Sequence, residues 1–159
     1  MIAHLPLSFP TSNFPFQVQR LARYCRNVLK VKDTLRSTVN LTFDGRVVKV
    51  YHGPKAQERF DNEVRVLRYL EERRCNFVPK VLEADRDELR LVTTSCGSRV
   101  DRIDDQRVKE LFAEVEQYGV RHDDPDPRNI TYRQSDGRFC VIDFEFAQIL
   151  SEDSPKPPQ

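Results

Sequence analysis

The chain has 159 residues, of which 38% are hydrophobic and 32% charged, and its 26 basic and 25 acidic residues leave a net charge of +1. A chain of this length fits one globular domain, which buries about 70% of the surface that the unfolded chain exposes. The near balance of charge gives no argument for binding nucleic acid or a membrane surface, and we expect neither as a partner.

The N-terminal part is expected to begin irregularly and then to form strands. Residues 1–16 are rich in proline and lack the basic start of a signal peptide, and residues 17–24 are a candidate short helix. Residues 27–32 alternate between apolar and polar side chains, which predicts a strand. Two β-rich runs in residues 38–51 flank Asp44-Gly45, a dipeptide typical of hairpin turns.

The middle of the chain predicts a helix followed by two strands. Apolar residues recur at helical spacing between Phe60 and Leu70, which predicts a helix over residues 55–73. Residues 77–97 then predict two strands joined at residues 85–87.

The last elements predicted are a second helix and another hairpin. Residues 104–119 form an amphipathic pattern with Gly119 at the position of a C-cap glycine. Residues 129–146 predict a hairpin that turns at Asp136-Gly137, and residues 151–159 form a polar, proline-rich tail that we expect to be disordered. This order of elements is an α+β pattern rather than an alternation of strands and helices.

The cysteines at positions 25, 75, 96 and 140 are far apart and include no C-x-x-C pair. Their spacing argues against a disulfide framework or a zinc site, and it favours a reduced, cytoplasmic setting. The sequence has no run of about 18 apolar residues, the length that a membrane-spanning helix requires.

Two charged residues occur where charge is costly. Lys49 lies among valines in "VVKVY", so it either points to water or has a partner. Glu63 shares a helix face with Phe60 and Leu67, where a carboxylate without a partner is unfavourable. Glu63 therefore either reaches water at the edge of this apolar face or pairs with Lys49 from a strand packed on the helix.

The segment "RHDDPDPRNI", residues 121–130, is either a solvated acidic turn or a site that binds a metal and moves a proton. Asp124 and Asn129 lie in it, and Asp143 follows in "FCVIDFEF" at the end of an apolar strand, where a carboxylate caps a turn or acts as a ligand. In phosphoryl transfer, a loop aspartate orients the attacking hydroxyl and accepts its proton, while an asparagine and a second aspartate hold magnesium. The order of these three residues fits that chemistry.

With these residues in order, the chain resembles the protein-kinase-like superfamily from about residue 27 to residue 150. Lys49 matches the lysine of the third strand, and Glu63 in "DNEVRVL" matches the glutamate of the regulatory helix. "LVTTSCG" resembles the fifth strand and the hinge beside adenine, and "HDDPDPRN" fits the pattern H-x-D-x-x-x-x-N. "IDFEFA" aligns with the D-F-G region and is similar to the choline and ethanolamine kinases and the aminoglycoside phosphotransferases.

The resemblance implies an α+β, protein-kinase-like fold in a domain of residues 17–150. Its N-lobe, about residues 17–96, would have five strands and one helix, and its C-lobe, about residues 97–150, would be strongly reduced. ATP and Mg²⁺ are the implied cofactors. The implied roles are Asp124 as base, Arg128 beside the transferred phosphoryl group, Lys49 and Glu63 at the phosphates, Thr94 and Cys96 at the nucleotide, and Asn129 and Asp143 as metal ligands.

Several positions depart from the family pattern. The segment between the first two strands, "DTLRST", contains no glycine, and glycines let backbone N–H groups approach phosphates closely. The side chains of Arg36, Ser37 and Thr38 are the alternative phosphate contacts. Asp123 replaces the arginine of H-R-D, so regulation by a phosphorylated activation loop is not expected, and Asp126 replaces a lysine.

Two functions from different classes remain open. One is an ATP-dependent phosphotransferase that transfers the γ-phosphate to a hydroxyl of a protein (Ser/Thr) or of a small molecule. The other is a non-catalytic pseudokinase that acts as a nucleotide-binding or scaffold module. The sequence shows no A-P-E segment after Asp143, so a protein partner or self-association would complete the thin core of the C-lobe.

Overall fold

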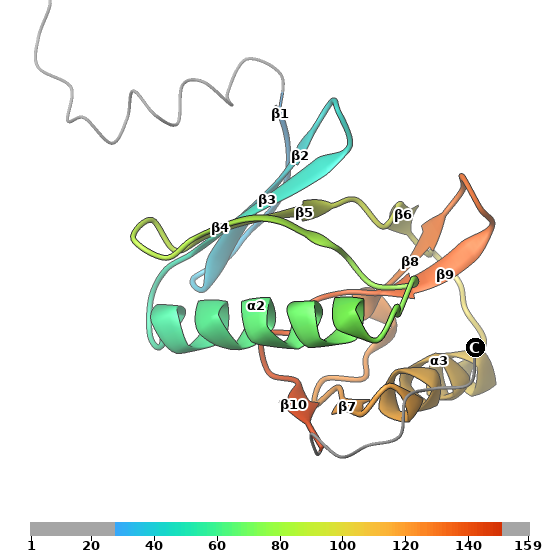
Figure 1. Cartoon of the computed structure of the whole chain (residues 1–159). Helices are drawn as coiled ribbons and strands as arrows, with labels where there is room; N and C mark the ends of the chain where they lie inside the picture. Colours follow the sequence, from blue (N-terminus) through green and yellow to red (C-terminus); the bar gives the residue numbers. More distant parts are fainter. Residues whose placement is uncertain (1–27, 151–159) are drawn as a thin grey trace, which may run out of the picture.

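The computed structural model describes residues 28–150, so the expected leader, the candidate helix at residues 17–24 and the tail lie outside the described residues. Its first half is an antiparallel sheet with strand order β1-β2-β3-β5-β4. Helix α2, Ala56–Glu72, lies along one face of this sheet (Figure 1). The five strands are β1 Val28–Asp33, β2 Ser37–Thr42, β3 Arg46–Tyr51, β4 Val81–Asp85 and β5 Arg90–Thr94.

The second half contains one longer helix and short strand pairs. Helix α3, Asp105–Gln117, begins at Asp104, whose carboxylate accepts hydrogen bonds from two backbone N–H groups of the first turn. Two small sheets have the orders β6-β8-β9 and β10-β7. The remaining elements are β6 Ser98–Arg99, β7 Val120–Arg121, the 3₁₀ turn η1 Pro127–Asn129, β8 Ile130–Arg133, β9 Arg138–Val141 and β10 Gln148–Ile149.

One continuous core joins the two halves. Leu67 and Leu70 of α2, Val115 of α3 and Phe144 are fully buried members of the same cluster. The backbone N–H of Val141 also donates to the carbonyl of Phe77, which connects the end of β9 to the segment after α2. Because the core is shared, the loops of the second half have fixed positions relative to the sheet.

The hinge between the halves depends on Gly97, whose φ is +88°. A Cβ atom at this position would lie 2.0 Å from the backbone oxygen of Tyr132 in β8. Only glycine combines this left-handed backbone with so close an approach. Gly97 therefore allows the chain to turn from β5 directly into β6, which pairs with β8.

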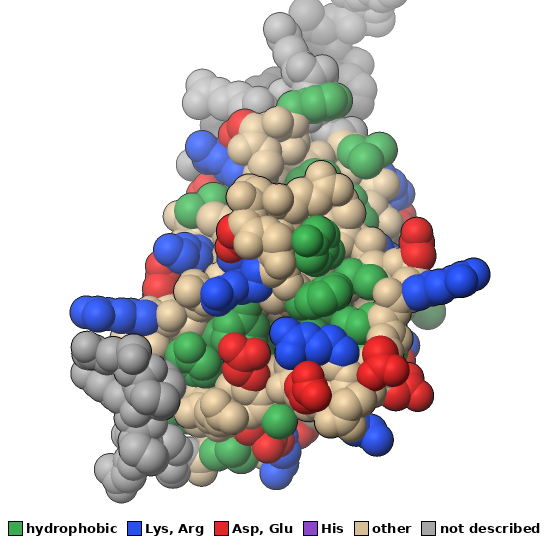
Figure 2. Space-filling model, turned by 90° about the vertical axis from the view of Figure 1, so that its right-hand side faces the viewer, with side chains coloured by type: hydrophobic (Ala, Val, Ile, Leu, Met, Phe, Trp, Pro, Cys, Tyr) green, Lys and Arg blue, Asp and Glu red, His purple; other side chains and the backbone are tan. Residues whose placement is uncertain are grey.

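The surface carries charge of both signs. Figure 2 shows one face on which hydrophobic side chains gather in the middle, among basic and acidic side chains. In the described range, Cys75, Cys96 and Cys140 are buried free thiols. None of the helices within residues 28–150 is long and apolar enough to cross a membrane.

The α+β class, the five-stranded sheet and the two helices predicted within the described residues are confirmed. The hairpin turns at Asp44-Gly45 and Asp136-Gly137 lie between β2 and β3 and between β8 and β9. The strands β6, β7 and β10 were not predicted, because two residues are too few to show an alternating pattern.

Candidate active site

The sheet register places Lys49 on the face that looks toward α2. Lys49 pairs with Val39 on β2 and with Leu91 on β5, so these three side chains share one face. Glu63 projects toward this face from α2, and its side chain is buried. Of the two alternatives for Glu63, the pairing with Lys49 is the one observed: Lys49 Nζ lies 2.7 Å from Glu63 Oε2.

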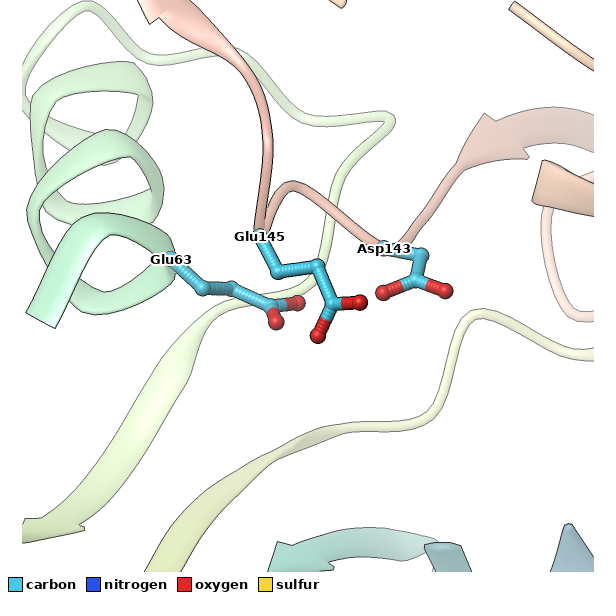
Figure 3. Close-up of side chains that lie close together, drawn as sticks. All are labelled: Glu63, Asp143 and Glu145. Carbon is cyan, nitrogen blue, oxygen red and sulfur yellow. The ribbon is translucent and has the colours of Figure 1, made fainter. Parts of the chain in front are cut away.

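Lys49 has two further acidic partners. Its Nζ lies 2.6 Å from Asp143 Oδ1 and 3.4 Å from Glu145 Oε2. Figure 3 shows the carboxylates of Glu63, Asp143 and Glu145 converging on one region. Burial lowers the pKa of Lys49, but the attraction of the three carboxylates outweighs this effect and leaves the pKa raised. The ammonium group therefore stays charged although it is buried.

Asp143 has an unusual backbone conformation. Its φ is +68°, in the left-handed region that non-glycine residues seldom adopt. Burial raises the pKa of its carboxyl, but Lys49 and, more weakly, Lys32 outweigh burial and leave the pKa below its usual value. Lys32 Nζ lies 3.6 Å from Asp143 Oδ2, so each carboxylate oxygen has a cationic partner.

Glu145 and Arg59 form a second buried ion pair. Arg59 Nη1 lies 3.2 Å from Glu145 Oε2, and both side chains are almost fully buried. The Arg59 guanidinium also donates to the carbonyls of Arg36, His52 and Pro54. Arg59 therefore connects the start of α2 and the β1–β2 turn to the segment after Asp143.

His122 fixes the path of the loop that carries Asp124 and Asn129. Its ring is buried between Phe112 and Phe144, at centroid distances of 5.1 and 5.0 Å. Nδ1 accepts the backbone N–H of Asp124, and Nε2 lies 3.1 Å from the carbonyl of Ile142. Because Nδ1 accepts, the hydrogen belongs on Nε2, where it donates to that carbonyl.

Asp124 and Asn129 are joined by hydrogen bonds. The Asn129 amide nitrogen donates to the backbone oxygen of Asp124 at 2.9 Å and to its Oδ2 at 3.1 Å. Ile142 donates its backbone N–H to the carbonyl of Asn129, which brings Asp143, the next residue, beside this loop. The three predicted catalytic and metal-binding residues thus converge from two segments.

Arg128 lies directly on Asp124, with 2.7 Å between Arg128 Nη2 and Asp124 Oδ2. The hydrogen bond from Arg128, assisted by the bond from Asn129, outweighs partial burial and lowers the pKa of the Asp124 carboxyl. Asp126 has a local role, since its side chain accepts the backbone N–H of Arg128 and caps η1. Asp124 is therefore an ionised, partly exposed carboxylate.

The donor set fits a magnesium ion, but not at the centre of the acidic cluster. One oxygen from each of Glu63, Asp143 and Glu145 lies within 4.8 Å of the others. The ammonium of Lys49 already contacts all three residues, so a cation bound among them would have to displace it. Asp143 and Asn129 supply the hard oxygen donors that Mg²⁺ prefers. Asn129 is bonded to Asp124, and the backbone bond from Ile142 to Asn129 brings Asp143 beside this loop.

The hinge residues have contacts within the protein. Thr94 donates its backbone N–H to the carbonyl of Lys80, and its Oγ1 accepts the Lys80 N–H. The carbonyl of Cys96 accepts from Thr131 Oγ1 at 2.7 Å. Nucleotide binding by Thr94 and Cys96 stays a prediction. The register instead places Thr93, paired with Val47, on the same face as Lys49, which sequence order alone did not indicate.

The side chains suggested as phosphate contacts between β1 and β2 point elsewhere. The Arg36 guanidinium lies over the ring of Phe146, 5.6 Å from its centroid. Ser37 is buried, and Thr38 Oγ1 donates to Asp33 Oδ1. This turn therefore does not offer the three side-chain contacts that the sequence suggested.

Comparisons with known proteins add evidence at the level of fold. No protein-family model matches the chain, and no curated protein matches it. A structure of a gentamicin–APH(2″)-IIa complex is similar with a TM-score of 0.61 and 14% identity, over 87% of this chain and 72% of that one. The Rio2 kinase of Chaetomium thermophilum, in an ADP/Mg²⁺-phosphoaspartate complex, is similar with a TM-score of 0.58 and 15% identity.

The alignment with Rio2 kinase covers 86% of this chain but 53% of the kinase, so the chain spans about half of that relative's length. Together with the strand order and the helix beneath the sheet, these similarities define the chain as having the protein-kinase-like fold. Of the residues that the resemblance in the sequence selected, Lys49 contacts Glu63 and Asp143, and Asp124 contacts Arg128 and Asn129 in the neighbouring loop. Thr94 and Cys96, which it also selected, make the other contacts described above.

Proposed function

We propose that this protein is an ATP- and Mg²⁺-dependent phosphotransferase that transfers the γ-phosphate to an alcohol hydroxyl. The observation that supports it best is the Lys49 ammonium, which Glu63 and Asp143 hold at 2.7 and 2.6 Å next to the loop of Asp124. A charged lysine aligned by a helix glutamate is the arrangement that kinases use to bind nucleotide phosphates.

Each of these residues then has a distinct task. Lys49 binds phosphate oxygens, and Glu63 positions the ammonium, since its carboxylate is buried and fully engaged. Tyr51 supports Glu63 by donating its hydroxyl to Glu63 Oε2. Asp143 and Asn129 would hold Mg²⁺, which supplies charge neutralisation at the phosphates when it is bound.

The main role of Asp124 is to orient the acceptor hydroxyl, and abstraction of the hydroxyl proton is secondary. A carboxyl whose pKa is lowered is a weak base, so strong proton abstraction is not expected from it. In a loose transition state the hydroxyl loses its proton late, and orientation is then the main contribution. Arg128, paired with Asp124, is well placed to interact with the transferred phosphoryl group.

The acceptor is a protein Ser/Thr hydroxyl or a hydroxyl of a small molecule. The two similar structures are a gentamicin complex of APH(2″)-IIa and an ADP/Mg²⁺-phosphoaspartate complex of the Rio2 kinase, and this likeness of fold leaves both acceptor classes open. The sequence "DFEFA" favours the small-molecule class through its resemblance to choline kinases and aminoglycoside phosphotransferases.

The second candidate is a pseudokinase that binds nucleotide without transferring phosphate. One observation favours it: the β1–β2 turn uses backbone N–H groups for its own hydrogen bonds, so it lacks a phosphate-binding contact that active kinases have. This candidate shares the nucleotide site with the first and differs only in turnover.

Two measurements separate these functions. Mg-ATP should raise the melting temperature of the wild-type protein and of the control Asp87→Asn, an exposed aspartate of the β4–β5 turn, but not that of Asp143→Asn. ATP consumption should then fall about 100-fold in Asp124→Asn, because the acceptor hydroxyl loses the carboxylate that orients it.

The outcomes are distinct. A wild-type protein that gains no stability from Mg-ATP would contradict both functions. Binding with equal ATP consumption in wild type and Asp124→Asn would contradict phosphotransfer and leave the pseudokinase.

A further inference from the structure

A β-bulge in β1 turns Lys32 onto the face of the sheet that carries Lys49. The pairing of β1 with β2 runs from Leu29 with Leu41 to Lys30 with Asn40, and then passes over Val31, so that Lys32 pairs with Val39. Residues paired across antiparallel strands share a face, and Val39 pairs with Lys49 on its other side.

The extra residue decides which side chain faces the site. Without the bulge, strict alternation would pair Val31 with Val39 and send Lys32 to the opposite face. With it, Lys32, Val39 and Lys49 form one row across three strands. Neighbouring strands are about 4.8 Å apart, so the two lysines are separated by about 10 Å at the backbone and converge through their side chains.

Lys32 and Lys49 meet at Asp143 in different ways. Lys49 Nζ contacts Oδ1 at 2.6 Å with its side chain 10% exposed, whereas Lys32 Nζ lies 3.6 Å from Oδ2 with its side chain 49% exposed. Lys49 is held by other carboxylates as well. For Lys32, Asp143 is the ion-pair partner within the described residues. Lys32 is therefore the cation that can move when Asp143 takes another ligand.

The adjacent turn does not supply the donors that phosphates would need. In the β1–β2 turn, Arg36 and Ser37 donate their backbone N–H groups to Thr34 Oγ1, and Thr34 donates its own to the carbonyl of Ser37. A glycine-rich turn instead directs such groups at phosphate oxygens.

Residues at and just before the start of α2 also hold the β1–β2 turn in place. Arg59 and His52 both donate to the carbonyl of Arg36. Gly53 approaches the same turn so closely that a Cβ there would lie 2.5 Å from the backbone oxygen of Leu35. Reorganising the turn to release the N–H groups of Thr34, Arg36 and Ser37 would disrupt these contacts, which favours a side chain as the phosphate contact at this end of the sheet.

We propose that Lys32 binds the β- and γ-phosphates of the nucleotide in place of the backbone N–H groups of a glycine-rich loop. This inference rests on the proposed function. When a metal ion occupies the Asp143 carboxylate, Lys32 loses its partner, and the phosphates provide an anionic one. Its ammonium has three donors and no fixed direction, which suits a flexible triphosphate.

The test compares Lys32→Gln with Lys30→Gln. The control Lys30→Gln removes the same charge from the same strand. Lys30, however, pairs with Asn40 and so lies on the opposite face of the sheet. Dissociation constants are measured for Mg-ATP, Mg-ADP and AMP by titration calorimetry. Lys32→Gln should weaken Mg-ATP about tenfold, the scale of one lost charge-assisted contact, and leave AMP unchanged. Lys30→Gln should change none of the three, and Lys32→Arg should retain most of the ATP affinity.

Three results would overturn the inference in distinguishable ways. Equal losses for ATP and AMP would show that Lys32 shapes the sheet rather than contacts phosphate. Wild-type ATP affinity in Lys32→Gln, with tighter Mg²⁺ binding in the absence of nucleotide, would make Lys32 only a counter-ion of Asp143. A wild-type protein that binds neither ATP nor ADP would reject the proposed function itself.

Discussion

The buried ion cluster and the loop of Asp124 use the same kinds of residue in opposite ways. In the buried ion cluster, defined as Lys49, Glu63, Asp143, Glu145 and Arg59, most charges have several partners, and four of the five residues are less than 10% exposed. In the loop, the Arg128 and Asp124 side chains are 55% and 39% exposed. A buried ion pair keeps its side chains in place, because losing one partner leaves the other charge buried and uncompensated. An exposed pair can separate at little cost in free energy, because water solvates both charges.

This difference separates rigid support from chemistry. The buried ion cluster determines where Lys49 and Asp143 lie, and its contacts connect β3, α2 and the segment after β9. The loop presents Asp124 to solvent, which is where the proposed function requires an acceptor to enter. Substitutions in the first region should therefore reduce stability, and those in the second should mainly change ionisation and turnover.

Lys49→Met is expected to have the largest effect on stability. It leaves three neighbouring carboxylates without their shared ammonium, and breaking a buried ion pair costs about 3–5 kcal/mol. Urea denaturation at pH 7 measures the free energy of unfolding, with the exposed Lys30→Met as the control. A loss below about 1 kcal/mol in Lys49→Met would contradict the structural role of the buried ion cluster.

Arg59→Met and Glu145→Leu should each be strongly destabilising, by about 3 kcal/mol, because each leaves its partner buried and charged. The double substitution should cost less than the sum of the two, since groups in direct contact couple by about 0.5–3 kcal/mol. A double-mutant cycle in urea measures this coupling. Additive losses would show that the pair does not act as a unit.

Helical periodicity in the sequence was enough to indicate which residue of α2 faces the core. It could not indicate contacts that depend on how strands pair with one another in the folded chain. Glu63 was recognisable because Phe60 and Leu67 placed it on an apolar helix face, and the structure confirms that it is buried against Lys49. Arg59 lies four residues earlier on the same face, so helix spacing alone offered a signal that was not used.

The face of the sheet on which Lys32 and Thr93 lie could not be predicted from the sequence. The face of Lys32 depends on a bulge at Val31 that alternation in the sequence does not reveal. The face of Thr93 depends on how β5 pairs with β3, which "LVTTSCG" does not encode by itself. Glu145 stood only inside the string "IDFEFA", and its burial beside Arg59 required the folded chain.

Acid should destabilise the protein through Asp143. Its folded pKa lies below the ordinary 3.8, so its contribution to stability is present above pH 3.8 and is lost as the pH falls through the folded value. Asp143→Asn should be less stable than wild type at neutral pH, and the difference should shrink below about pH 4. Urea midpoints between pH 2 and 7 measure this; a difference independent of pH would contradict it.

Arg128→Gln should have the smallest effect on stability, within about 1 kcal/mol, because the Asp124 pair is exposed. Its effect on ionisation should nevertheless be measurable: without the hydrogen bond from Arg128, the pKa of Asp124 should rise toward its ordinary value. Carbon-detected NMR titration of the Asp124 carboxyl tests this, with Arg121→Gln, which pairs with Asp123 instead, as the control. If Arg128→Gln left this pKa unchanged, the Asn129 amide rather than Arg128 would be the group that keeps Asp124 ionised.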